Sequence, residues 1–146
     1  MKTMKTMMAA MLFMMASTAC GGRDKVINET ELPTAAKTML KEHFPGQQVS
    51  LVQQDRDGMK TNYDVVLADG TKLEFDSKGE WTEVDSKPHD VPATIVPKAI
   101  SDCVNQKFQG ARIVQIERDR RGYEVELSNG IDMKFNKEFR LTEIDD

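Results

Sequence analysis

The chain has 146 residues and a formal net charge of −4, with 39% hydrophobic and 30% charged residues. This length suits a single compact domain. Its acidic balance argues against a nucleic-acid-binding protein, because affinity for phosphates needs clustered Lys and Arg. The nearest basic cluster, residues 118–121, is interrupted by Asp119 and is expected to be a solvated turn.

The first residues have the pattern of an export signal. Lys2 and Lys5 form a positive start, and residues 7–16 form an uninterrupted apolar run. That run is too short for the roughly 20 residues that cross a bilayer, and it fits the apolar part of a signal peptide. We therefore predict a signal peptide at residues 1–19. Its removal would also remove the two lysines and shift the net charge from −4 to −6.

Cys20 leaves two processing routes open. Small residues precede it and two glycines follow it, as at a bacterial lipoprotein site where the cysteine is lipidated. Ser17 and Ala19 equally satisfy the small-x-small rule of ordinary signal peptidase cleavage. The sequence therefore predicts an exported protein, either free in the periplasm or anchored in the membrane as a lipoprotein through Cys20. Residues 20–30 are expected to be an N-terminal linker.

The first structural unit is predicted at residues 31–86, as one helix followed by four strands. Pro33 suits the first helical turn, and Pro45-Gly46 ends the helix. Apolar residues recur at helical spacing between these limits, at Ala36, Met39, Leu40 and Phe44. The periodicity then changes from 3.6 to 2. Strands are predicted at residues 48–54, 63–67, 71–75 and 81–85.

The second unit, predicted at residues 87–146, repeats this pattern. Pro97 begins a helix with an apolar stripe at Ile100, Cys103, Val104 and Phe108. Strands are predicted at residues 112–118, 123–127, 131–135 and 139–145. Asp69-Gly70 and Asn129-Gly130 stand between the second and third strands of their units and are strong hairpin signals. Each unit of about 55 residues is marginal alone, so the two are expected to share a sheet or a core.

Strict alternation in the second unit separates two faces. Tyr123, Val125 and Leu127 point one way and are expected to pack under the helix, whereas the intervening acids point the other way. The first unit alternates less cleanly, because Val66 joins the polar side. The open face is thus the candidate surface for binding a partner. Its predicted contacts are Asp64, Val66, Lys72, Glu74, Trp81, Glu124, Glu126, Asp132 and Lys134. Trp81 is either a binding anchor on this face or a packing residue, as its counterpart Leu141 suggests.

The segments LPTAAKTMLKEHFPGQQV, YDVVLADGTKLEFDSKGEWTEVD and VPATIVPKAISDCVNQKFQGARIVQIERDRRGYEVELSNGIDMKFN resemble the PepSY-like, β-lactamase-inhibitor-like family of bacterial envelope proteins. The resemblance covers residues 31–146. It implies an α+β fold of tandem α-β4 repeats, with one continuous antiparallel sheet, helices on one face, and an open, often concave, opposite face. It also implies a periplasmic or lipoprotein location. It implies no established activity, and no inhibitory residue transfers to this chain.

The sequence carries only weak signals for a catalytic site or a metal site. The sequence has two histidines and two cysteines but no HExxH, paired CxxC or Gly-x-Ser-x-Gly motif. We predict no catalytic residues, no metal ligands and no cofactor. Asp55-Arg56-Asp57-Gly58 resembles the start of a calcium loop, yet Val66 stands where such a loop needs Glu, so a hairpin turn is favoured. Cys103 is expected to be a buried apolar thiol; a disulfide with Cys20 is the competing possibility.

The sequence therefore favours a non-enzymatic cell-envelope module that binds an envelope protein or peptide through the open sheet face, in the manner of an inhibitor. The alternative is a periplasmic protein that binds a small ligand or a cation through the same acidic face. A hydrolase is disfavoured because no nucleophile and base are placed together. No nucleic-acid partner is expected, and contact with the membrane is expected only through a lipid anchor at Cys20.

Overall fold

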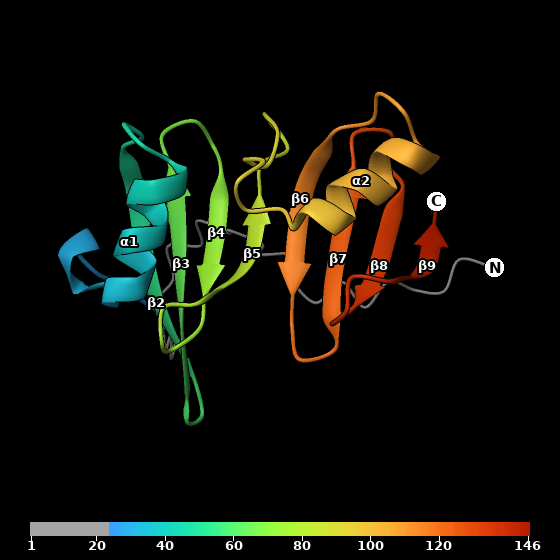
Figure 1. Ribbon diagram of the computed structural model, residues 1–146. Helices are drawn as coiled ribbons and strands as arrows, with labels where there is room; N and C mark the ends of the chain where they lie inside the picture. Colours follow the sequence, from blue (N-terminus) through green and yellow to red (C-terminus); the bar gives the residue numbers. More distant parts are fainter. Residues whose placement is uncertain (1–23) are drawn as a thin grey trace.

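The computed structural model of the protein describes residues 24–146, so the predicted signal peptide and Cys20 lie outside the described residues. In this part of the chain, nine strands form one antiparallel sheet in the order β1-β2-β3-β4-β5-β6-β7-β8-β9, which is also their order in the sequence. The helices α1 and α2 lie on the same face of this sheet, each over its own half (Figure 1). The predicted α+β fold with tandem α-β4 units and a continuous antiparallel sheet is confirmed.

The first unit contains α1 (Thr34–His43), β2 (Val49–Asp57), β3 (Lys60–Leu67), β4 (Lys72–Phe75) and β5 (Trp81–Asp85). Pro33 occupies the N-cap position of α1 without a side-chain hydrogen bond, and Gly46 follows the end of the helix with a φ of 77°. All four residues of the predicted apolar stripe of α1 are buried against the sheet. This burial stabilises the helix far more than its own propensity does, since ten residues are marginal as an isolated helix.

The second unit contains α2 (Lys98–Lys107), β6 (Ile113–Arg118), β7 (Gly122–Leu127), β8 (Asp132–Asn136) and β9 (Leu141–Asp145). Ile100 and Val104 of α2 are buried, and Cys103 and Phe108 pack against the core with part of their surface exposed. The two hairpin signals both form turns, with Gly70 and Gly130 at φ values of 91° and 86°.

The two units join at a seam between β5 and β6. Glu83, Val84 and Asp85 stand opposite Glu117, Ile116 and Gln115, respectively. Val84 and Ile116 are both fully buried on the helix side, so a single hydrophobic core runs beneath the seam. This agrees with the expectation that two marginal units share one core. The connecting segment adds Val91, Ile95 and Val96 to it.

The N-terminal segment has structure that the sequence did not predict. Lys25–Val26 forms β1, which pairs with the outer edge of β2, and Glu29–Glu31 forms a short 3-10 helix. Asn28 caps that helix by accepting from the backbone N–H of Thr30, and Glu31 accepts from the backbone N–H of Asn28 at 2.7 Å. Part of the expected linker 20–30 therefore belongs to the sheet.

Within residues 24–146, no helix has the length and apolarity needed to cross a membrane.

Candidate binding face

Five acidic residues lie side by side across the face of the sheet opposite the helices. We call them the acidic row: Asp64 on β3, Glu74 on β4, Glu83 on β5, Glu117 on β6 and Glu124 on β7. Each stands directly opposite the next in the strand register. Residues opposite one another on antiparallel strands have Cβ atoms about 5 Å apart, and like charges at that spacing repel. The fold thus places five carboxyl groups in one line across five strands.

Burial and mutual repulsion shift the titration of these groups. The pKa of Glu83 is raised to about 8, first by burial and then by the neighbouring charges of Glu117, Glu74 and Asp85. The pKa values of Asp64 and Glu117 are each raised to about 7, again by burial first and by nearby carboxylates second. Burial also raises the pKa of Glu74. Asp64, Glu83 and Glu117 therefore hold protons near neutral pH that ordinary carboxyl groups would have lost.

Gln115 hydrogen-bonds to two members of the acidic row at the seam between β5 and β6. Its side-chain Nε2 donates to Glu83 Oε1 at 2.6 Å and to Glu117 Oε1 at 3.3 Å. Glu83 is 7% exposed and Gln115 3% exposed. Glu83 Oε2 and Gln115 Oε1 have no hydrogen-bond partner in the described part of the chain. Two buried oxygen atoms at the middle of the sheet thus lack hydrogen-bond partners there, and leaving such groups unsatisfied is costly.

Basic residues on this face lie beside the acidic row. Lys134 on β8 continues the row next to Glu124 and forms ion pairs with Glu143 at 3.0 Å and Asp145 at 3.9 Å. Lys87 pairs with Glu126 at 3.3 Å. Among residues 24–146, Asp64, Glu74, Glu83 and Glu117 make no ion pair. Acidic groups outside these ion pairs are consequently concentrated over β3 to β6.

Eight of the nine predicted contact residues belong to the open face by strand register. Asp64, Glu74, Glu124 and Lys134 lie in the line of the acidic row. The other four lie in the adjoining line of the same face: Val66, Lys72, Glu126 and Asp132. That line also contains Asp85 and Gln115. Asp132 is 1% exposed, so its prediction as a direct contact is wrong. Its strand position nevertheless belongs to the open face, opposite Glu126.

Trp81 is also wrongly predicted as an open-face contact. It is 8% exposed and belongs to the hydrophobic core. The register shifts between Glu74 and Phe75, and Trp81 stands opposite the buried Phe75. This bulge breaks the strict alternation of β5 and turns the indole toward the helix side. The packing alternative suggested by Leu141 is the one that the structure supports.

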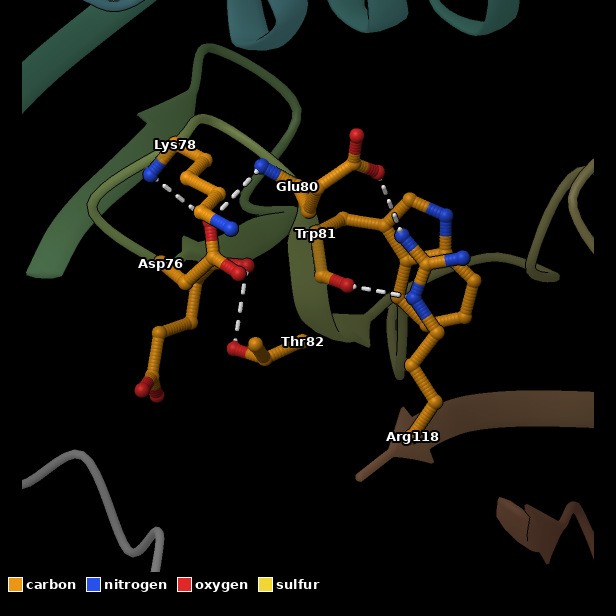
Figure 2. A network of polar contacts seen from close by, with 7 residues as sticks. Asp76, Lys78, Glu80, Trp81, Thr82 and Arg118 are labelled. Atoms are coloured by element: carbon orange, nitrogen blue, oxygen red, sulfur yellow. Dashed lines mark hydrogen bonds and ion pairs between the residues drawn. The ribbon is translucent and has the colours of Figure 1, made fainter. Parts of the chain in front are cut away.

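Arg118 fixes Trp81 from across the seam. Its guanidinium lies 3.9 Å from the centre of the indole ring, its Nε donates to the Trp81 carbonyl at 2.6 Å, and its Nη2 contacts Glu80 Oε2 at 3.2 Å (Figure 2). The basic cluster 118–121 was expected to be a solvated turn. Residues 119–121 do form the turn between β6 and β7, but Arg118 instead connects the two units.

A cavity of about 320 Å³ lies on the helix side, between α1 and this corner. Its lining includes Glu42, His43, Glu80, Trp81 and Arg118. His43 Nδ1 is 2.8 Å from Thr94 Oγ1, so the histidine links α1 to the connecting segment. The contacts of His43 and Arg118 are accounted for by packing, and they do not assemble a nucleophile with a base.

Three other features bear on chemistry: metal-ligand clusters, Cys103 and the calcium-like segment at Asp55. Nowhere in residues 24–146 are three His, Cys, Asp or Glu side chains gathered closely enough to hold a metal ion as they stand. Cys103 is a free thiol there, and its proposed partner Cys20 lies outside this range. Asp55 to Gly58 lie at the end of β2 and the hairpin turn to β3, as predicted, with Gly58 at a φ of 63°.

Sequence reasoning missed Glu83, Gln115 and Glu117 as members of the face. Glu83 lies between Thr82 and Val84, and its equivalence to Glu143 was visible in the repeat. The missing information was the pairing of β5 with β6, which brings Glu83 and Glu117 together. Treating the sheet as continuous and aligning the alternation across the seam would have identified them.

The family model described as "Putative beta-lactamase-inhibitor-like, PepSY-like" matches residues 61–143. No curated protein matches the chain. A solved structure from Bacteroides vulgatus, described as a "putative periplasmic protein", has 42% sequence identity and a TM-score of 0.83; the match covers 87% of this chain and all of the other.

Two further solved structures are similar to this chain. One, from Bacteroides thetaiotaomicron, is described as a "putative calcium-regulated periplasmic protein", with 41% identity, a TM-score of 0.82, and coverage of 84% of this chain and 97% of the other. The other, from Bacteroides vulgatus, is described as a "putative periplasmic protein of unknown function", with 41% identity, a TM-score of 0.81, and coverage of 84% and 99%.

Proposed function

The chain belongs to the PepSY-like family, and we propose that it is a non-enzymatic module of the bacterial envelope that binds a positively charged partner on its open sheet face. The single observation that carries this proposal is the acidic row. Neighbouring carboxyl groups in it repel one another, and the raised pKa values of Asp64, Glu83 and Glu117 reflect burial first and that repulsion second.

A partner that supplies positive charge would relieve this repulsion. Lys or Arg side chains of an envelope protein or peptide could lie along the row, each facing one or two carboxylates. Charge complementarity of this kind gives specificity and faster association more than raw affinity. Binding would therefore weaken as salt is added, because exposed charges are screened. The periplasmic description of the three relatives supports an envelope location.

Crosslinked capture from the native envelope tests this proposal. The bait is the chain without its predicted signal peptide. A neutralised variant carries Asp64→Asn, Glu74→Gln and Glu117→Gln. A matched control, Glu42→Gln, Asp102→Asn and Glu138→Gln, converts the same number of carboxyl groups to amides at exposed positions elsewhere. We expect the wild type and the control to capture the same protein and the neutralised variant to lose it. Equal capture by all three would contradict the proposal.

A divalent cation is the second candidate ligand of the same face. It is favoured by the two buried oxygens without hydrogen-bond partners, Glu83 Oε2 and Gln115 Oε1. Carboxylate and amide oxygens are the ligands that calcium prefers. The description of the relative from Bacteroides thetaiotaomicron points the same way. Because the side chains are not gathered around a metal position, a cation would have to draw Glu83 and Glu117 together.

Thermal melting with added calcium separates the two candidates. A cation that binds only the folded chain raises the melting temperature as its concentration rises. If calcium is the ligand, the rise should occur in the wild type, disappear in Glu83→Gln, and exceed the effect of magnesium at the same concentration. An unchanged melting temperature across millimolar calcium would remove this candidate and leave the positively charged partner.

A further inference from the structure

The outer edge of β9 corresponds, in the repeat, to the edge of β5 that pairs with β6 at the seam. Thr82, Glu83 and Asp85 of β5 recur as Thr142, Glu143 and Asp145 of β9. β5 pairs with β4 on one side and with β6 on the other, whereas β9 pairs only with β8 among the described strands. Val84 is 0% exposed at the seam, and its equivalent Ile144 is 44% exposed. The second unit thus presents an uncovered version of the seam.

The opposite edge of the sheet carries the complementary strand. β2 is the first-unit equivalent of β6, since Asp55-Arg56 recurs as Asp119-Arg120. β6 is the strand that receives β5 at the seam. The corresponding edge of β2 receives only β1, which is two residues long. Apart from the short β1, the first strand of the sheet is therefore β2, the equivalent of the strand that β5 pairs with.

Transferring the seam register to these two edges gives a specific pairing. Val84 opposite Ile116 becomes Ile144 opposite Val52, so an exposed apolar residue would be covered by an apolar one. Glu83 opposite Glu117 becomes Glu143 opposite Gln53, which replaces a repulsive acid pair with an acid and an amide. Asp85 opposite Gln115 becomes Asp145 opposite Leu51. The edge pairing is thus electrostatically easier than the seam itself.

β1 occupies the positions that this pairing needs. Lys25 and Val26 stand opposite Gln54 and Gln53, and the backbone N–H of Ile27 donates to the Val52 carbonyl at 3.0 Å. Short strands that cover an edge are a known protection against pairing between molecules. We propose that the β9 edge docks a second copy of this chain through the β2 edge, head to tail, and that β1 prevents this while it remains in place.

This interface uses different surfaces on the two copies, so a pair of copies leaves one β9 edge and one β2 edge unoccupied. Each added copy presents a new β9 edge, and the product is a series of lengths rather than a dimer. The chain with β1 in place is monomeric, and displacement of β1 exposes the receiving edge. The proposal concerns the sheet edges only and does not depend on what binds the acidic row.

Light scattering coupled to size exclusion tests the proposal on the chain without its predicted signal peptide and with Cys20 removed. Ile27→Pro removes the N–H that bonds to Val52 and should uncover the β2 edge. We expect the average mass of this variant to rise beyond twice the monomer mass as its concentration increases. Adding Ile144→Lys should return it to a monomer. Adding Met59→Lys, at an exposed apolar residue on the β2–β3 turn, should not.

Ile27 is partly buried, so a second variant guards against loss of folding. Lys25→Gly with Val26→Gly weakens β1 and leaves the core intact. A folded monomer in both uncovered variants would overturn the proposal. So would a dimer that grows no further, because that product indicates β9–β9 or β2–β2 pairing. Association that survives Ile144→Lys would equally exclude the β9 edge.

Disulfide trapping tests the register. In an uncovered background with Cys103→Ser, a chain carrying Glu143→Cys is mixed with one carrying Gln53→Cys. Residues directly opposite one another have Cβ atoms near the spacing that a disulfide needs. We expect this mixture to crosslink at least several-fold faster than a mixture of Thr142→Cys with Gln53→Cys. Equal rates for the two mixtures would contradict the proposed pairing.

Discussion

The two repeats differ most at the corner that leads into their fourth strand. In the first repeat Gly79 turns at a φ of 84°, close beneath α1, and Trp81 follows it into the core. In the second repeat Phe139 takes the same turn at a φ of 63°, and Leu141 replaces the tryptophan. The first corner is enclosed by its helix and by Arg118 of the next unit. The second corner ends the sheet and stays open.

The comparison separates two reasons for a glycine at this corner: the positive φ of the turn and the close packing against α1. Both corners make the same backbone hydrogen bond, from Gly79 N–H to Asp76 and from Phe139 N–H to Asn136, each at 3.0 Å. A positive φ costs a non-glycine residue about 1–2 kcal/mol, and Phe139 bears this cost while its ring contacts Tyr123 at 5.3 Å between centroids. Glycine is thus demanded at residue 79 by close packing more than by the turn.

The largest expected effect comes from adding a side chain between Gly79 and the start of α1. A Cβ added at Gly79 would lie 2.7 Å from Pro33 Cβ and 2.9 Å from the Ala36 nitrogen. Gly79→Ala should lower the free energy of unfolding by about 3 kcal/mol, from overpacking and an unfavourable φ together. Phe139→Gly should change it by less than about 1 kcal/mol, because relief of φ strain offsets the lost ring contact. Urea denaturation of both variants measures the contrast, and equal losses would contradict it.

Arg118 gives the next contrast between the two corners. It lies on β6 and contacts the first corner, whereas no described strand lies beyond β9 to supply such a residue to the second. Arg118→Ala removes the contact with the Trp81 ring and the bond to its carbonyl. We expect a loss of about 2 kcal/mol in unfolding free energy. Arg121→Ala, on the adjacent turn with an exposed ion pair to Asp119, should cost less than about 0.5 kcal/mol. Similar losses for the two arginines would mean that Arg118 does not hold the corner.

The acidic row predicts an unusual dependence of stability on pH. The ordinary pKa of Glu is 4.5, and that of Glu83 in the folded chain is raised to about 8, so the folded state binds more protons between these values. Stability should therefore be highest near pH 4.5 and fall as pH rises toward 8. Glu83→Gln should raise the melting temperature at pH 8 by several degrees and flatten the profile. A melting temperature that rises from pH 5 to 8 would contradict this account.

Glu143 is the second-repeat equivalent of Glu83 and offers the matched comparison. It is exposed and paired with Lys134, which lowers its pKa, so Glu143→Gln should leave the profile between pH 5 and pH 8 unchanged. Lys134→Ala should cost less than about 1 kcal/mol, as expected of an exposed ion pair. Melting each variant at pH 5 and pH 8 distinguishes the buried carboxyl group from the exposed one. A large stability loss on removing Lys134 would show that β9 depends on this pair.

Local pattern was enough to predict most of the fold. The change of period from 3.6 to 2, the Asp69-Gly70 and Asn129-Gly130 turns, and the apolar stripe of α1 each encode structure within a few residues. The repeat itself indicated a shared sheet. β1 was missed because two exposed residues carry no periodic signal, and their pairing depends on the β2 edge that receives them.

The candidate site was predicted only in part, because it depends on contacts between units. Asp64, Glu74 and Glu124 follow from alternation within a strand. Glu83 and Glu117 become neighbours only through the β5–β6 pairing. Trp81 was misplaced since a bulge interrupts the alternation that the sequence suggests. Asp132 is buried although its alternation within β8 assigns it to the open face, so alternation alone does not report exposure.

Binding of a short Lys- and Arg-containing peptide to the isotope-labelled chain, followed by amide chemical shifts at low salt, tests the central claim most directly. We predict shifts concentrated on β3 to β7, lost in the Asp64→Asn, Glu74→Gln, Glu117→Gln variant and at high salt, and retained in the Glu42→Gln, Asp102→Asn, Glu138→Gln control. Shifts that persist in the neutralised variant, or that lie on the helix side, would contradict the assignment of the acidic row as the binding surface.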